Sequence, residues 1–172
     1  QRIATAQAAL KELGLAACLV PSSDPHLSEY LPARWQGRVW LSGFTGSMAT
    51  LVVGSQRAAL FADSRYWVQA ESQLQGTGIE LVRIHSAASP AHLDWLVEQV
   101  PHGGSVAVDG QVLSLAAAQT LQRRLDAAGI VLRTASDVLD AIWRDRPAPP
   151  LEPVSIQDIK HSRRRKESNV TF

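Results

Sequence analysis

The sequence predicts an α/β fold in which a mixed β-sheet is flanked by helices. Six short apolar segments have strand character, and helical segments are interleaved with them along the 172 residues. The second and third of these segments are separated only by Gly54, Ser55 and Gln56, which predicts an antiparallel hairpin. The later segments alternate with helices, which is typical of parallel strands, so the sheet should be mixed.

The amino-terminal third of the chain combines one helix, three strands and a long loop. Apolar residues recur at three- and four-residue steps from Ile3 until Gly14, which predicts an amphipathic helix. A buried strand is predicted at residues 16–20, and the Pro-, Ser- and Gly-rich residues 21–40 predict a long loop with about one helical turn. The two strands of the hairpin are expected at residues 49–55 and 57–63.

The rest of the chain alternates helices and strands. Helices are predicted at residues 65–74, 89–100, 114–129 and 136–145. Strands are predicted between them at residues 79–84, 105–110 and 130–134. Polar residues that can cap a helix precede three of these helices: Asp63 or Ser64, Ser89 followed by Pro90, and Ser136 or Asp137.

A proline-rich stretch follows the last predicted helix. "PAPPLEP", residues 147–153, has four prolines in seven residues, which excludes a helix and predicts an extended segment. We therefore expect one domain over residues 1–146, a linker over 147–159 and a disordered basic tail over 160–172.

Composition and charge exclude several classes of protein. No apolar run approaches the roughly 18 to 20 residues of a membrane span, and we expect no signal peptide. The single cysteine, Cys18, excludes an internal disulfide, so a buried thiol and a cytoplasmic location are expected. Residues 160–172 carry five basic residues against one acidic, but a short basic run without aromatic residues is more typical of a solvated end than of a nucleic-acid site.

The stretch "SGFTGSMATLVV", Ser42 to Val53, has glycines at positions 43 and 46. A phosphate-binding loop would need a lysine after the second glycine and a helix after the loop, whereas Ser47 and Met48 follow and a strand comes next. No G-x-S-x-G elbow for a nucleophilic serine occurs. We interpret the stretch as a tight turn that leads into the hairpin.

Asp126 and Asp137 have ten residues between them, a spacing that some two-metal peptidases use. Asp126 lies near the end of a predicted helix, however, and Asp137 can cap the next helix. No pair of His or Glu residues follows them at a useful distance, so we interpret both as structural.

Ionisable side chains gather in two polar clusters, "SSDPHLSEY" at residues 22–30 and "DSRY" at residues 63–66. Asp24, His26, Glu29 and Arg65 stand there beside strand ends, which is where sites occur in α/β sheets. They can bind a ligand or form structural ion pairs with each other, and both interpretations remain open.

Four blocks identify a resemblance: "VPSSDPHLSEYLP", "RVWLSGFTGSMATLVV", "ALFADSRYWVQAESQL" and "IWRDRPAPP". In this order they closely resemble the amino-terminal region of Xaa-Pro aminopeptidases, in the creatinase/prolidase group. The resemblance implies a ribonuclease H-like amino-terminal domain. In the whole enzyme two Mn ions would be held by two Asp, a His and two Glu in a later catalytic domain, and none of these ligands maps onto this chain.

The resemblance implies a non-catalytic domain that shapes access of short proline-containing peptides to the catalytic domain of the same longer chain, and that contributes to homodimer contacts. Candidate substrate-facing residues are His26, Tyr30, Phe44, Arg65 and Tyr66. The family usually has Gly where this chain has Ser64, so we expect no positive φ there. The alternatives are a free-standing peptide- or nucleic-acid-binding module and a domain of a prolidase- or creatinase-like hydrolase.

Overall fold

A single six-stranded sheet of order β4-β3-β2-β1-β5-β6 forms the centre of the computed structural model, which describes residues 1–150. Strand β1 pairs antiparallel with β2 and parallel with β5, β2 pairs antiparallel with β3, and the β3–β4 and β5–β6 pairs are parallel. The predicted mixed sheet and hairpin are therefore confirmed. The strands are β1 Ala17–Pro21, β2 Thr50–Gly54, β3 Ala58–Asp63, β4 Ile79–Ile84, β5 Ser105–Ala107 and β6 Val131–Arg133.

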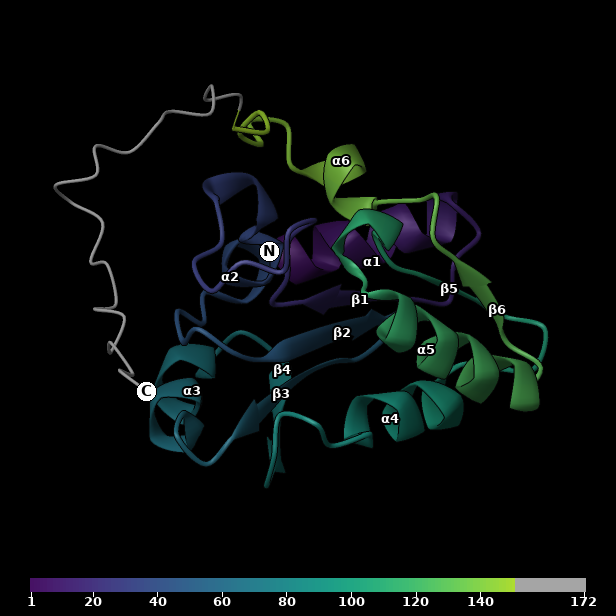
Figure 1. The fold of residues 1–172 in the computed structure, drawn as a ribbon, viewed down its shortest axis with the longest axis horizontal. Coiled ribbons are helices and arrows are strands. Elements are labelled where there is room, and N and C mark those ends of the chain that lie inside the picture. Colours follow the sequence, from purple (N-terminus) through teal and green to yellow (C-terminus); the bar gives the residue numbers. More distant parts are fainter. Residues whose placement is uncertain (151–172) are drawn as a thin grey trace, which may run out of the picture.

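Helices cover both faces of this sheet (Figure 1). One core layer joins one face to helices α1, α2, α3 and α6, and includes the buried Leu10, Leu41 and Leu139. The other layer joins the opposite face to α4 and α5, through Leu96 and Leu125. The helices are α1 Arg2–Glu12, α2 Gly37–Ser42, α3 Trp67–Leu74, α4 Ala91–Gln99, α5 Leu115–Ala127 and α6 Val138–Ile142.

The prediction for residues 21–40 was incomplete. The segment contains a 3-10 turn, Ala33–Trp35, and then α2, so "SGFTGS" begins at the end of a helix rather than after a loop. Gly43 follows α2 in the left-handed conformation with φ 75, which ends the helix. The six residues of α2 are too few to show a helical period in the sequence, and the helix depends on tertiary packing.

Helix caps agree with the sequence in part. The side chains of Ser114 and Asp137 accept hydrogen bonds from the backbone of Ala117 and Leu139, which caps α5 and α6 as local sequence allows. The predicted cap of α3 was wrong, because the helix begins after Tyr66 rather than after Asp63 or Ser64. Pro90 rather than Ser89 directly precedes α4, but Ser89 Oγ accepts a hydrogen bond of 3.3 Å from the amide of Ala91, the first residue of the helix.

The last described segment packs against the segment that precedes the glycine-containing motif. The Trp143 ring stacks on Trp40 with centroids 4.9 Å apart. Arg146 forms ion pairs with Asp137 and Asp140 and donates from Nε to the backbone oxygen of Arg34 at 3.1 Å. These contacts fix α6 over α1 and α2. The predicted linker and tail from residue 151 onward lie outside the described residues.

Gly37 and Leu139 form the contact through which α2 and α6 should be coupled. A Cβ on residue 37 would lie 2.2 Å from Leu139 Cδ1, inside contact distance. We expect Gly37→Ala to destabilise the protein by about 1 to 3 kcal/mol through overpacking, and Leu139→Ala by about 2 to 5 kcal/mol through loss of buried volume.

Urea unfolding of both single variants and the double variant measures this coupling. The Gly37→Ala change should be neutral or stabilising in the Leu139→Ala background, because the clashing methyl group is gone. Leu115→Ala is the matched control, since Leu115 is 75% exposed on α5. Additive effects of the two changes would contradict this account.

Candidate functional site

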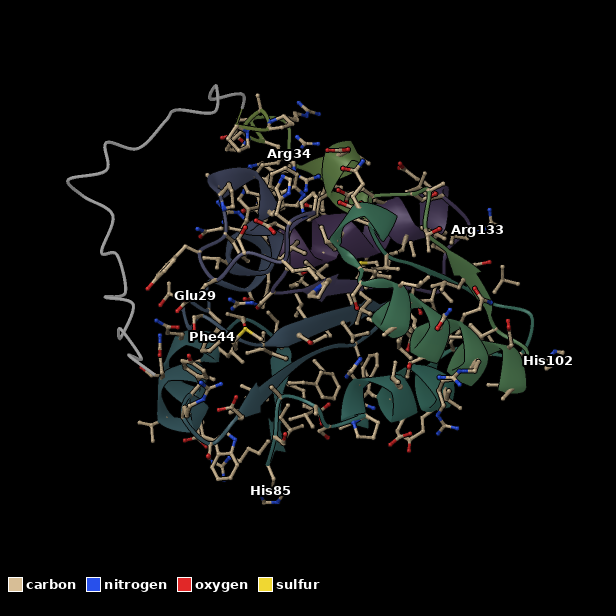
Figure 2. The ribbon with its side chains drawn as sticks, in the orientation of Figure 1. Glu29, Arg34, Phe44, His85, His102 and Arg133 are labelled. Carbon is tan, nitrogen blue, oxygen red and sulfur yellow. The ribbon has the colours of Figure 1, made fainter. Side chains whose placement is uncertain are left out.

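Three polar segments meet at one edge of the sheet. Strand β1 ends at Pro21, which pairs with Thr50 at the start of β2, and Thr50 in turn pairs with Phe61 near the end of β3. Three segments adjoin these strand ends. The polar loop (residues 22–32) follows β1, the glycine loop (residues 43–49) precedes β2, and the Asp63 turn (residues 63–66) lies at the end of β3. Glu29 and Phe44 mark this edge in Figure 2.

Arg38 of α2 holds the glycine loop. Its side chain donates from Nη1 to the Phe44 oxygen at 2.9 Å, from Nη2 to the Gly46 oxygen at 2.5 Å and from Nε to Ser22 Oγ at 2.7 Å. Only 3% of Arg38 is exposed, and burial lowers its pKa to about 10, so the guanidinium stays charged at neutral pH. No carboxylate within residues 1–150 forms an ion pair with it.

Two serines and a glycine complete the glycine loop. Ser42 Oγ donates to the Arg38 oxygen and accepts from the Phe44 amide, and Ser22 Oγ donates to the Ala49 oxygen at 2.7 Å. A Cβ at Gly46 would lie 2.3 Å from the Phe44 ring, so only glycine fits there. The Phe44 and Gly46 carbonyl oxygens face a cation, an arrangement unlike the row of amides that binds a phosphate.

The Asp63 turn is a closed ion pair. Asp63 Oδ1 accepts from Arg65 Nε at 2.9 Å, and Oδ2 accepts from Nη2 at 2.8 Å. The hydrogen-bonded Arg65 side chain lowers the pKa of Asp63, and the same contact raises the pKa of the exposed Arg65. Beside it, Tyr66 Oη and Ser47 Oγ share a hydrogen bond of 2.6 Å, which links the turn to the glycine loop.

The polar loop is built around the buried Asp24. Its Oδ1 accepts from the amides of His26 at 3.0 Å and Ser28 at 2.9 Å. Burial raises the pKa of Asp24, but the hydrogen bonds from Ser28 and His26 outweigh it, so the pKa lies below the ordinary value. Leu27 has φ 53, the only positive φ of a non-glycine within residues 1–150, so Ser64 needs none, as expected. The turn presents His26 and Tyr30 to solvent.

A cavity of about 230 Å³ lies between the polar loop and the glycine loop. Its lining includes Ser22, Tyr30, Trp35, Arg38 and Ser47. Two aromatic side chains, several hydroxyl groups and one buried cation therefore meet around one opening.

Four of the five predicted substrate-facing residues lie at this edge with exposed or half-buried side chains: His26, Tyr30, Arg65 and Tyr66. Their contact with a substrate stays a prediction. The expectation for Phe44 was wrong, because its ring is fully buried between Arg38, at 5.0 Å, and the edge of Tyr66, at 5.9 Å. The ring supports the site and cannot touch a peptide.

Sequence reasoning missed Arg38 altogether. The available signal was the i, i+4 relation between Arg38 and Ser42, which has meaning only if residues 37–42 are helical. A segment predicted to be a loop gives no indication of this contact. The open question about the ionisable clusters is answered in part, since Arg65 pairs with Asp63, and Asp24 accepts hydrogen bonds from amides of its own loop.

Other candidate sites lose support within residues 1–150. No three His, Cys, Asp or Glu side chains there come close enough to hold a metal ion. Asp137 caps α6 and pairs with Arg146, whereas Asp126 accepts from Gln122, so the two do not act together. Cys18 is buried, and burial raises its pKa to about 12, which makes the thiol inert. No described helix could cross a membrane.

A family model for the creatinase/prolidase N-terminal domain matches residues 2–144. Among curated proteins the chain is 35% identical over 153 residues to "Aminopeptidase P2" of Arabidopsis thaliana, covering 87% of the chain and 21% of the relative. It is 32% identical over 156 residues to "Xaa-Pro aminopeptidase 2" of Rattus norvegicus, covering 89% and 23%. The chain thus spans only about a quarter of the length of these relatives.

Solved structures of similar proteins have the same fold. The X-prolyl aminopeptidase of Caenorhabditis elegans, described as a cytosolic enzyme with a di-nuclear active site, matches with TM-score 0.78 and 31% identity, covering 92% of this chain and 28% of that one. The N-terminal domain of the cytoplasmic peptidase PepQ of Mycobacterium tuberculosis matches with TM-score 0.64 and 26% identity, covering 82% and 97%. This second structure contains little more than the matching domain.

Removal of the Asp63 carboxylate should flatten the response of stability to acid. Because the folded pKa of Asp63 is lowered, the stability it contributes is present above its ordinary pKa of 3.8 and is lost as the pH falls through the lower folded value. The free energy of unfolding of Asp63→Asn should therefore be lower than that of the unchanged protein at neutral pH, with a smaller further loss between about pH 5 and about pH 2.

Urea unfolding at a series of pH values tests this expectation. Asp145→Asn is the matched control, since Asp145 is exposed and makes no ion pair within residues 1–150. An acid response of Asp63→Asn as steep as that of the unchanged protein would refute the assignment.

Proposed function

Because this chain belongs to the creatinase/prolidase N-terminal domain family, we propose that it is the non-catalytic N-terminal domain of an Xaa-Pro aminopeptidase, which releases the first residue of peptides with proline second. The observation that carries the proposal is the match of residues 2–144 to a domain that is only about a quarter of the similar aminopeptidases. The catalytic part is proposed to lie in the rest of the longer polypeptide.

The metal centre is proposed to belong to that remaining part. The C. elegans relative is described as having a di-nuclear active site, and we propose two manganese ions for the parent of this chain. The donor groups within residues 1–150 do not fit such a centre, since no three of them converge. We also propose a cytosolic location, as stated for that relative.

The proposed role of the domain is to wall the substrate entrance. The edge formed by the polar loop and the Asp63 turn presents His26, Tyr30, Arg65 and Tyr66 on a support fixed by Arg38. Tyr30 is 84% exposed, and its ring can pack against a proline ring once a facing surface is present. We propose that this edge limits entry to short peptides and contributes to contacts in a homodimer.

The chain by itself is expected to be inactive. Incubation with an Xaa-Pro tripeptide and added Mn²⁺ should release no amino-terminal residue above a buffer control, because no three metal-donor side chains converge within residues 1–150. Chromatography of the products measures this. Chelator-sensitive release by the pure chain would overturn the assignment as a non-catalytic domain.

The gating role can be tested in a hybrid enzyme. Residues 1–150 replace the corresponding segment of the rat relative, and the hybrid should cleave a tripeptide, whereas deletion of the segment should impair cleavage. In the hybrid, Tyr30→Ala and Arg65→Ala should raise KM about threefold or more with little change in kcat, because they touch substrate away from the scissile bond.

The control for this experiment is Leu115→Ala on the opposite face of the sheet, where residue 115 lies in α5 and is exposed. It should leave both kinetic constants unchanged. If Tyr30→Ala and Arg65→Ala behave like this control, the edge does not contact substrate.

A further inference from the structure

Arg38 carries a positive charge that the described chain does not neutralise. A guanidinium has five N–H groups, and three of those of Arg38 are engaged by Ser22, Phe44 and Gly46. All three acceptors are uncharged. Because buried charges in proteins are normally paired, an arginine that is 3% exposed and has no acidic partner within residues 1–150 favours binding of an anionic ligand beside it.

The cavity beside Arg38 provides the space for such an anion. Arg38 is part of its lining, together with hydroxyl groups of Ser22, Thr45 and Ser47 that can add hydrogen bonds. Its volume of about 230 Å³ is below the range of about 300 to 1,000 Å³ typical of drug-sized ligands. The cavity therefore suits a carboxylate and the residue that bears it, and not a long peptide.

The apolar part of the lining suits the remainder of a carboxyl-terminal residue. Tyr30 and Trp35 contribute aromatic surface, and Leu31 and Val39 contribute aliphatic surface. One N–H group on each of Nη1 and Nη2 of Arg38 is not used by the loops. A carboxylate accepts charge-assisted hydrogen bonds from such groups, which are stronger than those that an uncharged amide accepts. The nearby Arg65 does not compete for this role, because both oxygens of Asp63 already bind it.

Glu29 is the acidic residue in this lining. Its side chain is exposed and makes no ion pair with Arg38 in the structure, so it does not neutralise the guanidinium. A bound carboxylate would be repelled by it, although solvent weakens this repulsion. The affinity of the site for an anion should therefore depend on Glu29, since removal of its negative charge should strengthen anion binding.

We propose that the cavity between the polar loop and the glycine loop is a carboxylate-binding site, in which Arg38 receives the free carboxyl terminus of a short peptide. The identity of the natural ligand rests on the proposed function, whereas binding itself is a property of these residues alone. If the proposed catalytic part holds the cleaved bond at a fixed distance from this site, recognition of the terminal carboxylate would favour short peptides, because only peptides of one length would reach both.

The test compares an acid with its amide. Acetyl-glycyl-proline and acetyl-glycyl-prolinamide are each titrated into the 172-residue chain, with the amide signals of residues 43–49 and the Trp35 indole followed by NMR. The acid should bind at least about tenfold more tightly than the amide, and its binding should weaken with added salt. Equal binding of the two compounds, or no binding of the acid, would overturn the proposal.

Variants locate the effect. Glu29→Gln should tighten binding of the acid by about threefold and leave the amide unaffected, with Asp145→Asn as the matched loss of one distant carboxylate. Ser47→Ala should weaken the acid severalfold. Arg38→Lys keeps the charge but loses the planar fork, so it should reduce the preference for the acid. If Arg38→Lys fails to fold, the Glu29→Gln and Ser47→Ala variants still test the site. An affinity for the acid that neither of these two changes alters would refute the site.

The outcome is independent of the hybrid-enzyme experiment. An active hybrid together with a chain that does not distinguish acid from amide would remove the carboxylate site and leave the proposed function standing. Selective binding of the acid by the chain, together with an inactive hybrid enzyme, would support the carboxylate site and contradict the proposed function.

Discussion

The three hydrogen bonds of Arg38 are the constraint on which the functional edge of this domain depends. They connect α2 to the polar loop through Ser22 and to the glycine loop through Phe44 and Gly46. Without them the glycine loop would have two buried backbone carbonyls, those of Phe44 and Gly46, with no partner, a loss of about 1 to 3 kcal/mol for each such group. The same guanidinium that organises the loops also contributes a positive charge to the lining of the cavity, so the proposed ligand preference rests on the side chain that fixes the loops.

The support of this edge extends to the other end of the described chain. Residues 34–40 precede the glycine loop, and they are held by Trp143 and Arg146 through ring stacking and backbone hydrogen bonds. The last described residues are therefore tied by packed contacts to the segment that carries Arg38.

The sequence was sufficient for most of the sheet and for part of the site. The hairpin followed from the short polar interval at residues 54–56, and the cap of α6 followed from Asp137, because such features depend on neighbours a few residues apart. The polar clusters were correctly located at strand ends. Phe44 was misjudged, since a motif does not reveal which of its side chains face inward, and α2 was missed because six residues contain too little periodicity.

The sequence by itself therefore determined the order of helices and strands, the mixed sheet and the family resemblance, all of which are encoded in local spacing or in ordered motifs. Only the tertiary structure decided which charged groups are neutralised. Arg65 finds Asp63 two residues away, whereas the environment of Arg38 depends on Ser22 and on burial beneath the loops, and Arg146 reaches Arg34 across 112 positions of the chain. Such pairings follow from folding in three dimensions, because burial sets the cost of an unpaired charge and no local pattern specifies which charged side chains become buried.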